Sequence, residues 1–260
     1  MELGLKGRIV LVTGGSYGIG RAIALTLAAE GCPVALCART KDRLEQTARD
    51  VRRKGVECLP IPADVMVTAD IDRVVQTVID AWGTIGILIN NVGGGGGREP
   101  RPVEQVPEAQ WRETYERNAL AAVRFTMRVI PHMRKAKWGR VVTITSVQGR
   151  EGGGRPWYNM AKAAETSLMK TLALNPDLVR DGITFNSVAP GRILFAGNEW
   201  DEFRKEDPAR FEQRMKDQLP LGRPGTPEEV ANVVAFVCSG KAGLLNGAAI
   251  AVDGGESRSF

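Results

Sequence analysis

The sequence predicts an α/β fold, with a doubly wound, mostly parallel sheet of seven strands and helices on both faces. Two observations lead to this prediction. Short runs of apolar and β-branched residues alternate along the chain with longer segments of helical period, and such alternation gives right-handed crossovers between parallel strands. The strand runs are also continuously apolar, as expected of strands that are buried on both faces.

The elements follow one another in a regular order. Strands are predicted at 8–12, 34–37, 58–61, 85–89, 140–144, 183–188 and 249–252. Helices are predicted at 19–30, 41–53, 68–82, 108–137, 158–180 and 227–239. Pro176 should kink the fifth helix or end it early, because proline lacks the N–H donor and clashes with the preceding turn. With no internal repeat and no linker, residues 1–260 are expected to form one domain.

Composition bounds the class of protein. Of the 260 residues, 43% are hydrophobic and 25% charged, which is ordinary for a globular protein, and no apolar run could cross a bilayer. No secretory signal is recognised at the N-terminus. The four cysteines lack metal-ligand spacing, and His132 is the only histidine, so no metal site is expected. Scattered free cysteines are typical of a reducing compartment, so we expect a cytoplasmic protein without a membrane partner. The net charge of +5 is spread along the chain, so no nucleic-acid partner is expected.

A glycine-rich turn connects the first predicted strand to the first helix. Residues 13–20 read TGGSYGIG, with Gly14, Gly18 and Gly20 at the turn. Such glycines permit a tight turn, a close approach of the backbone to a pyrophosphate, and close packing of helix on strand. The helix N-terminus then offers free N–H groups to phosphates. The position between strand and helix favours a dinucleotide site over a purely structural turn.

The end of the second strand indicates which dinucleotide binds. An acidic residue usually lies there and binds the ribose 2′-hydroxyl. This chain has Arg39 instead, preceded by Ala38 and followed by Thr40. A guanidinium matches a 2′-phosphate in charge and in paired donors, so NADP is predicted rather than NAD. The alternative is that Arg39 is only a surface charge at the start of a helix.

A tyrosine and a lysine form the second chemical motif. Tyr158 and Lys162 are four residues apart, so on a helix they lie on one face. A phenol with a pKa near 10 is a poor acid or base at neutral pH, and an adjacent ammonium lowers that pKa toward the working range. Ser146 ends the preceding strand, where its hydroxyl could reach the same substrate oxygen, and Asn118 lies on the helix after the fourth strand.

Residues 195–219 interrupt the strand–helix alternation. The segment is rich in charge and also carries Phe195, Trp200, Phe203 and Phe211. One interpretation is a solvated pair of surface helices. Its position after a strand's carboxyl end, where open α/β sheets bind ligands, favours a mobile lid over an apolar substrate group.

Taken together, these motifs resemble the short-chain dehydrogenase/reductase family, of the kind that includes 3-oxoacyl-carrier-protein reductases. They occur in family order: TGGSYGIG at 13–20, Asp64-Val65, NNVG at 90–93, Asn118, Ser146, YNMAK at 158–162, Pro190-Gly191 and the closing Asn246-Gly247 and Asp253-Gly254-Gly255. The resemblance covers residues 5–255 and implies a Rossmann-type sheet. It also implies four catalytic residues, which are Asn118, Ser146, Tyr158 and Lys162.

In this resemblance Tyr158 donates a proton to the carbonyl, Ser146 holds the carbonyl oxygen, and Lys162 binds the nicotinamide ribose. Asn118 holds a water that relays protons. The implied cofactor residues are Gly14, Ser16, Tyr17, Gly18, Ile19, Gly20, Arg39, Thr40, Asp64, Val65, Asn91, Val92, Gly93, Tyr158, Lys162, Pro190, Gly191 and Ile193.

Some positions depart from the family pattern. Tyr17 lies where NADP-preferring members often carry a second basic residue, and Phe195 lies where a threonine usually bonds the carboxamide. Val92 replaces the usual alanine, and residues 93–97 are an unusual run of five glycines beside the site.

The expected function is therefore an NADP(H)-dependent oxidoreductase that interconverts a ketone or aldehyde and an alcohol by hydride transfer, with a 3-oxoacyl reductase as the candidate that the resemblance suggests. The expected partner is a small carbonyl or alcohol substrate with an apolar part. The resemblance implies a homotetramer or homodimer, built through the helices that carry Asn118 and Tyr158 and through the C-terminal strand. Two alternatives are a non-catalytic NADP-binding sensor or scaffold, and a family member that catalyses epimerisation or dehydration.

Overall fold

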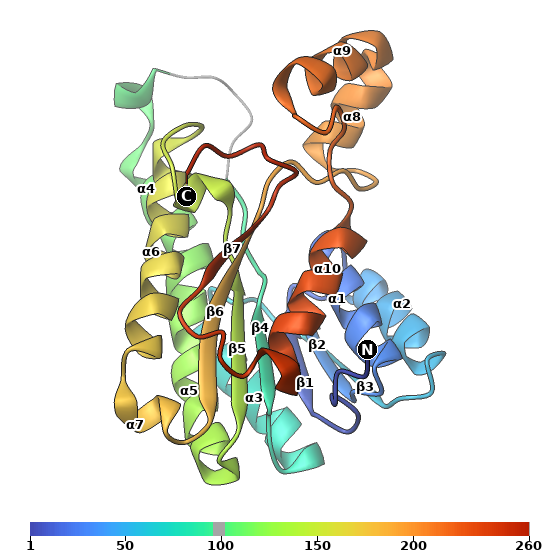
Figure 1. Cartoon of the computed structure of the whole chain (residues 1–260), viewed down its shortest axis with the longest axis vertical. Helices are drawn as coiled ribbons and strands as arrows, with labels where there is room; N and C mark the ends of the chain where they lie inside the picture. The colour runs from blue at the N-terminus through green and yellow to red at the C-terminus, as the bar shows by residue number, and fades with distance from the viewer. Residues whose placement is uncertain (96–101, 260) are drawn as a thin grey trace.

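The computed structural model describes residues 1–95 and 102–259. Within these ranges seven strands form one sheet in the order β3-β2-β1-β4-β5-β6-β7, and every neighbouring pair is parallel (Figure 1). The strands are β1 (Val10–Thr13), β2 (Val34–Ala38), β3 (Cys58–Pro62), β4 (Ile87–Asn90), β5 (Gly139–Ile144), β6 (Ile183–Pro190) and β7 (Ala249–Val252). The predicted doubly wound, Rossmann-type sheet is confirmed, and the sheet is parallel throughout.

Side chains alternate between two apolar cores, one on each face of the sheet. In β1, Val10 and Val12 enter the core shared with α1 (Gly18–Ala29), α2 (Lys41–Arg52) and α10 (Pro227–Cys238), whereas Leu11 enters the opposite core. That second core is shared with α3 (Thr68–Trp82), α5 (Ala121–Ala136) and α6 (Pro156–Ala173). Because both faces are covered, the strands are continuously apolar rather than alternating in sequence.

Two predicted helices are divided in the structure. The segment predicted as one helix at 108–137 consists of α4 (Glu108–Tyr115), a π-helical turn (Glu116–Leu120) and α5. The segment predicted at 158–180 ends at Ala173, and α7 (Pro176–Val179) begins at Pro176. The interruption expected at this proline is therefore confirmed, since a proline is tolerated in the first turn of a new helix but not inside an old one.

The segment between β6 and α10 forms two helices, α8 (Glu199–Glu206) and α9 (Pro208–Gln218). They stand off the end of the sheet at the top of Figure 1. Phe211, Met215 and Leu219 form a separate small apolar cluster, against which Trp200 and Phe203 pack. The pair of helices therefore has a core of its own, distinct from the two cores of the sheet.

All four cysteines lie inside the fold. Cys32, Cys37, Cys58 and Cys238 are free thiols and are buried. Burial raises the pKa of Cys32, Cys37 and Cys58 to about 12 and raises that of Cys238 as well. No helix in the described ranges is long and apolar enough to cross a membrane.

Candidate active site

The candidate site begins where the strand order reverses, between β1 and β4. Thr13 ends β1, and its hydroxyl oxygen accepts hydrogen bonds from the backbone N–H groups of Asn91 (2.9 Å) and Val92 (3.2 Å). The Asn91 amide donates in return to the carbonyls of Thr13 (3.0 Å) and Gly14 (3.2 Å). These bonds fix the glycine-rich turn against the end of β4, at the point where open α/β sheets bind ligands. Thr13 was not predicted as a site residue, although its place at the strand end was a usable signal.

The glycines at this turn are required by close contacts. Gly14 has a φ of 66°, in the region that favours glycine. A Cβ on Gly20 would lie 2.3 Å from the Gly14 carbonyl oxygen and 2.4 Å from Asn91 Nδ2. Any side chain at this position would displace α1 from the strand end, so the turn is kept open by the absence of side chains.

The start of α1 fits the phosphates of a dinucleotide. Tyr17 precedes the helix without a side-chain capping bond, and the first turn of this fully described helix contains no acidic residue. Its first N–H groups therefore have no side-chain acceptor, and the helix dipole presents positive charge at the same point. Ser16 lies in the turn itself, where its carbonyl accepts a bond from Thr47, and Ile19 packs against the first core.

Aromatic side chains connect this turn to the α8–α9 segment. Phe195 lies edge-on to Tyr17, with ring centroids 5.3 Å apart. Its ring atoms are 2.8 Å from the point that a Cβ on Gly18 would occupy. The Arg43 guanidinium covers Tyr17 at 4.8 Å from the ring centroid. The chain leading into α8 is therefore packed directly on the predicted phosphate-binding turn.

The residues predicted to contact the adenosine lie at the ends of β2 and β3. Arg39 and Thr40 follow β2 and are exposed, and Thr40 precedes α2 without a side-chain capping bond. Asp64 follows β3, where its Oδ1 accepts a bond from the Met66 N–H (3.0 Å), and Val65 is 5% exposed. β2 and β3 are parallel neighbours in the sheet, so the residues that follow them lie side by side at the carboxyl ends of the strands.

Tyr158 and Lys162 lie on one face of α6, as their spacing predicts. Lys162 Nζ is 5.7 Å from the centroid of the Tyr158 ring. Lys162 is 2% exposed, and its ammonium donates to the Ile144 carbonyl (3.0 Å) and to Glu165 Oε2 (2.9 Å). Glu165 was not predicted as a site residue, although an acid three residues after a lysine on a helix is a recognisable pair.

Asn118 occupies the π-helical turn between α4 and α5. Its Nδ2 donates to the carbonyls of Thr114 (2.7 Å) and Gly94 (3.2 Å), and its Oδ1 accepts from the Gly94 N–H (3.2 Å). Single π turns often occur at functional sites because they displace a residue from the regular helix ladder. Here the turn brings a fully buried amide to the loop that follows β4.

Gly93 brings Asn118 and Lys162 together. A Cβ on Gly93 would lie 2.6 Å from Asn118 Oδ1 and 2.9 Å from Lys162 Nζ. The two side chains thus flank the same glycine, one from the π turn and one from α6. Of the five-glycine run noted in the sequence, residues 96 and 97 lie outside the described residues.

Ser146 begins a short 3₁₀ turn (Val147–Gly149) directly after β5. Its Oγ accepts a bond from the Gln148 N–H (3.2 Å), so the hydroxyl is held at the strand end. Gly149 packs against α6, because a Cβ there would lie 2.7 Å from the Lys162 carbonyl oxygen. The turn that carries Ser146 is therefore pressed onto the helix that carries Tyr158.

The predicted nicotinamide-flanking residues follow β6. Pro190 ends the strand, and the Gly191 N–H donates to the Val252 carbonyl of β7 (3.2 Å). Ile193 is 6% exposed and pairs with Gly225 in an isolated bridge. Near the same end of the sheet the Arg155 guanidinium (Nη2) lies 3.8 Å from Glu199 Oε2. This ion pair connects the start of α6 to the start of α8.

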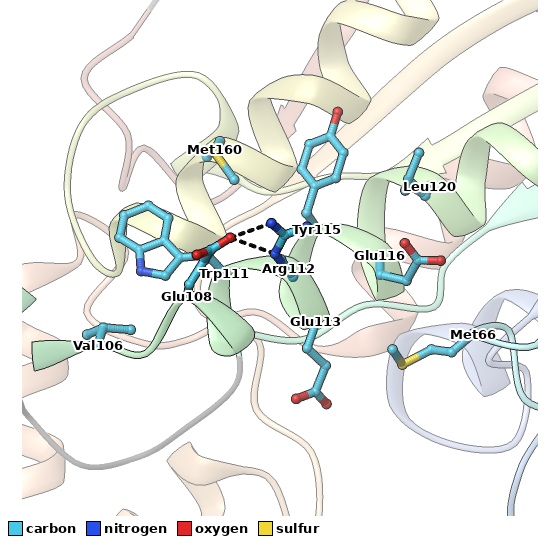
Figure 2. A pocket seen from close by; sticks show the side chains of 10 residues that line it. All are labelled: Met66, Val106, Glu108, Trp111, Arg112, Glu113, Tyr115, Glu116, Leu120 and Met160. Atoms are coloured by element: carbon cyan, nitrogen blue, oxygen red, sulfur yellow. Dashed lines mark hydrogen bonds and ion pairs between the residues drawn. The ribbon is translucent and has the colours of Figure 1, made fainter.

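A separate groove runs along the outer face of α4 and the π turn (Figure 2). Its volume is about 1000 Å³, and it is lined by Met66, Val106, Glu108, Trp111, Arg112, Glu113, Tyr115, Glu116, Leu120 and Met160. None of these ten lining residues belongs to the predicted catalytic set. The groove is therefore distinct from the site at the strand ends, although Met160 comes from the same helix as Tyr158.

Comparison with known proteins places this geometry in a family. Residues 14–257 match the family model described as Enoyl-(Acyl carrier protein) reductase. The chain is 34% identical to the 3-oxoacyl-acyl-carrier-protein reductase FabG of Staphylococcus epidermidis over 247 residues, which are 94% of this chain and 97% of that protein. The chain belongs to the short-chain dehydrogenase/reductase family of oxidoreductases, and within it this is a FabG-like member.

Solved structures agree with this assignment. L-sorbose reductase from Gluconobacter frateurii, in complex with NADPH and L-sorbose, superposes with a TM-score of 0.91 at 32% identity and covers 100% of both chains. A 7α-hydroxysteroid dehydrogenase in complex with NADH and 7-oxo glycochenodeoxycholic acid has a TM-score of 0.88 at 30% identity, covering 99% of this chain and 97% of its own. These two relatives differ in both cofactor and substrate.

Proposed function

We propose that the protein is an NADP(H)-dependent oxidoreductase that interconverts a carbonyl compound and an alcohol with Tyr158 as the acid/base. The observation that carries this proposal is the position of Tyr158 and the buried Lys162 on α6, beside Gly93 and the strand ends. A phenol next to a buried ammonium can exchange a proton near neutral pH, which an isolated phenol cannot.

The proposed roles of the four side chains are those that the family resemblance implies, and their positions at the strand ends and on α6 support them. Ser146 holds the carbonyl oxygen of the substrate. Tyr158 donates its phenolic proton to that oxygen as the C=O bond is reduced to a C–O bond. Lys162 stabilises the phenolate that remains and binds the cofactor ribose. Asn118 fixes the Gly93-Gly94 loop by its two hydrogen bonds to Gly94. Its proposed further role is to hold a water through which Tyr158 regains its proton. The nicotinamide, when bound, supplies the hydride for reduction or accepts it in the reverse direction.

The proposed preference for NADP(H) rests on the end of β2. An exposed arginine follows Ala38 where an acid would otherwise bind a ribose hydroxyl, and the next helix begins without a side-chain cap. Both features favour an additional phosphate. The relatives alone do not decide this point, since one was solved with NADPH and the other with NADH.

The proposed substrate is a ketone with an apolar part, and a 3-oxoacyl thioester is the first candidate because the FabG relative is named for it. The α8–α9 segment with Trp200 and Phe203 is the proposed lid over that apolar part. Residues 1–260 act as a single domain in this proposal, in a cytoplasmic protein.

A homotetramer, or a homodimer, is proposed for the assembly. The groove on α4 and the exposed Met160 of α6 offer one helical face to a second copy. β7 is one of the two edge strands of the described sheet, and its apolar residues are only partly covered, so it offers the other face. Light scattering that shows only a particle of about 28.2 kDa at micromolar concentration contradicts this assembly.

The test of the proposed function is NADPH consumption with a panel of ketones that includes 3-oxoacyl thioesters, steroid ketones and ketoses. Net oxidation of NADPH with formation of the alcohol supports the proposal. NADPH binding without consumption by any ketone indicates a sensor or scaffold. Conversion of substrate with no net change in NADPH indicates an epimerase or dehydratase.

A further inference from the structure

A buried carboxylate that the proposed mechanism does not use lies one helical turn beyond Lys162. Glu165 is 1% exposed, and its Oε2 accepts a hydrogen bond from Lys162 Nζ over 2.9 Å. Both side chains belong to α6, at a spacing that places them on the same face. The carboxylate therefore shares the interior of the protein with the ammonium that serves Tyr158.

The ammonium of Lys162 lies near both Glu165 and Tyr158, and these two neighbours have opposite effects on the ionisation of the phenol. Its three N–H donors serve the Ile144 carbonyl at 3.0 Å and Glu165 at 2.9 Å, which leaves one for the side of Tyr158 and the cofactor. A free ammonium beside a phenol favours the phenolate. An ammonium already paired with a carboxylate favours it less, because the two charges largely cancel at the distance of the phenol.

Other charged and titratable groups lie on the elements packed against α6. The elements packed against α6 contribute charged or titratable groups from α4, the π turn, α7, β5 and the loop after Ser146, whereas β6 and the 3₁₀ turn contribute none. Those groups are Glu108, Arg112, Glu113, Tyr115, Glu116, Arg117, Asp177, Arg140, Arg150, Glu151 and Arg155. Three of the acids on α4 and the π turn pair with arginines at the surface, in Glu108–Arg112, Glu113–Arg117 and Glu116–Arg124.

The raised pKa of Lys162 supports an ion pair, whereas the raised pKa of Glu165 by itself favours the neutral acid. The pair therefore rests on its geometry, which is a 2.9 Å hydrogen bond between two buried side chains. Burial acts to lower the pKa of Lys162, but the charges of Glu165 and Tyr158 outweigh it and raise the pKa. Burial raises the pKa of Glu165, and Lys162 offsets only part of that rise. For the described part of the chain, no other charged group contributes to either shift.

We propose that Glu165 is a positioning residue, which fixes the Lys162 ammonium and balances its charge so that Tyr158 keeps its proton at neutral pH. This inference rests on the proposed function. Reduction of a carbonyl needs the protonated phenol as acid, whereas oxidation of an alcohol needs the phenolate as base. Glu165 thereby adapts the site to ketone reduction, and it acts through Lys162 without touching the substrate.

The first test is the pH profile of kcat/KM for ketone reduction with NADPH, in the wild type and in Glu165→Gln. Glutamine keeps the shape and an oxygen acceptor but removes the charge. Reduction falls at high pH as Tyr158 loses its proton, and the midpoint of that fall should move down by about one pH unit or more in the variant. An unchanged midpoint, or one that moves up, overturns the inference.

Two further variants make the test graded. Glu165→Asp keeps the charge on a shorter side chain, so its midpoint should lie between those of the wild type and Glu165→Gln. Thr166→Val removes the side-chain bond to the Lys162 carbonyl without changing any charge, and its midpoint should match the wild type. If Glu165→Gln does not fold, Glu165→Met takes its place, because it removes the same charge on a side chain of similar length. An unchanged midpoint in that variant contradicts the proposal.

The second test does not depend on turnover. The chain has three tyrosines, so the ultraviolet difference between a protein and its Tyr158→Phe form reports the ionisation of Tyr158. This titration should occur at lower pH in the Glu165→Gln background. If the titration of Tyr158 moves to lower pH but the protein reduces no ketone, the role of Glu165 is supported and the proposed function is not. Turnover with identical titrations overturns the role of Glu165 and leaves the proposed function intact.

Discussion

The strand ends and the α8–α9 segment are held in place by different means. Around Lys162 and Asn118, backbone carbonyls and buried side chains fix each functional group, and both residues are at most 2% exposed. The α8–α9 segment relies on a small cluster around Phe211 and on ion pairs of α8. The main cores therefore fix the reacting groups, whereas the proposed substrate lid rests on a smaller cluster of its own.

The two regions nevertheless touch at defined points. Phe195 lies on the glycine-rich turn through Tyr17, and Glu199 faces Arg155 at the start of α6. Trp200 is flanked by Arg192 and Arg214, at 5.2 Å and 5.5 Å from its ring centroid. Segments with few fixed contacts belong to the low-stability end of a fold. We therefore expect the lid to move about its root near Phe195 while the strand ends stay in place.

The largest effect is expected at the rigid end of this comparison. Tyr158→Phe removes only the proton donor, so ketone reduction should fall by about 10²–10⁴-fold while NADPH binding is retained. Steady-state rates and the quenching of protein fluorescence by NADPH measure the two properties. Tyr115→Phe, in the separate groove, is the matched control and should keep the wild-type rate. A Tyr158→Phe enzyme with more than about a tenth of wild-type turnover contradicts the assignment.

The next effect concerns cofactor choice. Arg39→Ala should reduce the preference for NADPH over NADH, measured as the ratio of the two kcat/KM values, by about 10- to 150-fold, since charge-assisted hydrogen bonds contribute about 1.5–3 kcal/mol. Arg49→Ala removes the same charge from the exposed face of α2 and should leave the ratio unchanged. Equal affinity of the wild-type protein for NADPH and NADH would refute the proposed preference.

A smaller effect is expected in the lid, and on KM more than on kcat. Trp200→Ala should raise the KM for an apolar ketone at least several-fold, because covering the substrate with one aromatic ring contributes at most about 1.5–3 kcal/mol. Phe203→Ala should do the same, partly by loosening its edge-on contact with Phe211. A fall in kcat as large as that of Tyr158→Phe would show that the lid and the strand ends act as one unit. Unchanged KM values would remove both residues from the substrate site.

The smallest effect is expected from the contacts of Asp201, which stabilise only the α8–α9 segment. Asp201 is 1% exposed, and its bonds to Lys205, the Gly197 N–H and Arg204 hold its pKa at about 2. Because this pKa lies below the unfolded value of about 3.9, the stabilisation is complete above that pH and is lost as the pH falls through about 2. Asp201→Asn should therefore speed amide hydrogen exchange in 195–219 at neutral pH and leave exchange in the sheet unchanged.

The wild-type protein supplies the control for the lid itself. Amides in 195–219 should exchange faster than those of the sheet in the free protein, and should slow when NADP and a substrate analogue bind together. If they are already as protected as the sheet amides, the α8–α9 segment is a rigid surface structure and the lid proposal is wrong.

Much of the fold was predictable because it depends on local patterns. The seven apolar runs became the seven strands, and Pro176 ended α6 as expected. The π turn around Asn118 was not predicted, since the helical period of 108–137 continues through it without a break. At this turn the backbone of Gly94, from a loop distant in the sequence, bonds the Asn118 amide, and no pattern within 108–137 reports that contact.

In the candidate site, too, some features could be predicted from local sequence patterns and others could not. The spacing of Tyr158 and Lys162 predicted their shared face, and the structure shows it. The contact of Phe195 with the glycine-rich turn joins segments that are far apart in the sequence, and no local pattern reports such a contact. Glu165 was overlooked because an acid on a helix is usually solvated, and only its burial distinguishes it.

The buried thiols have a practical consequence for experiments on this protein. Alkylating reagents react with the thiolate, and Cys32, Cys37, Cys58 and Cys238 are all buried with raised pKa values. Native protein should therefore resist maleimide dyes without the removal of any cysteine. A single new thiol on the exposed face of α9, introduced as Gln213→Cys, would then carry one fluorophore and report lid movement directly.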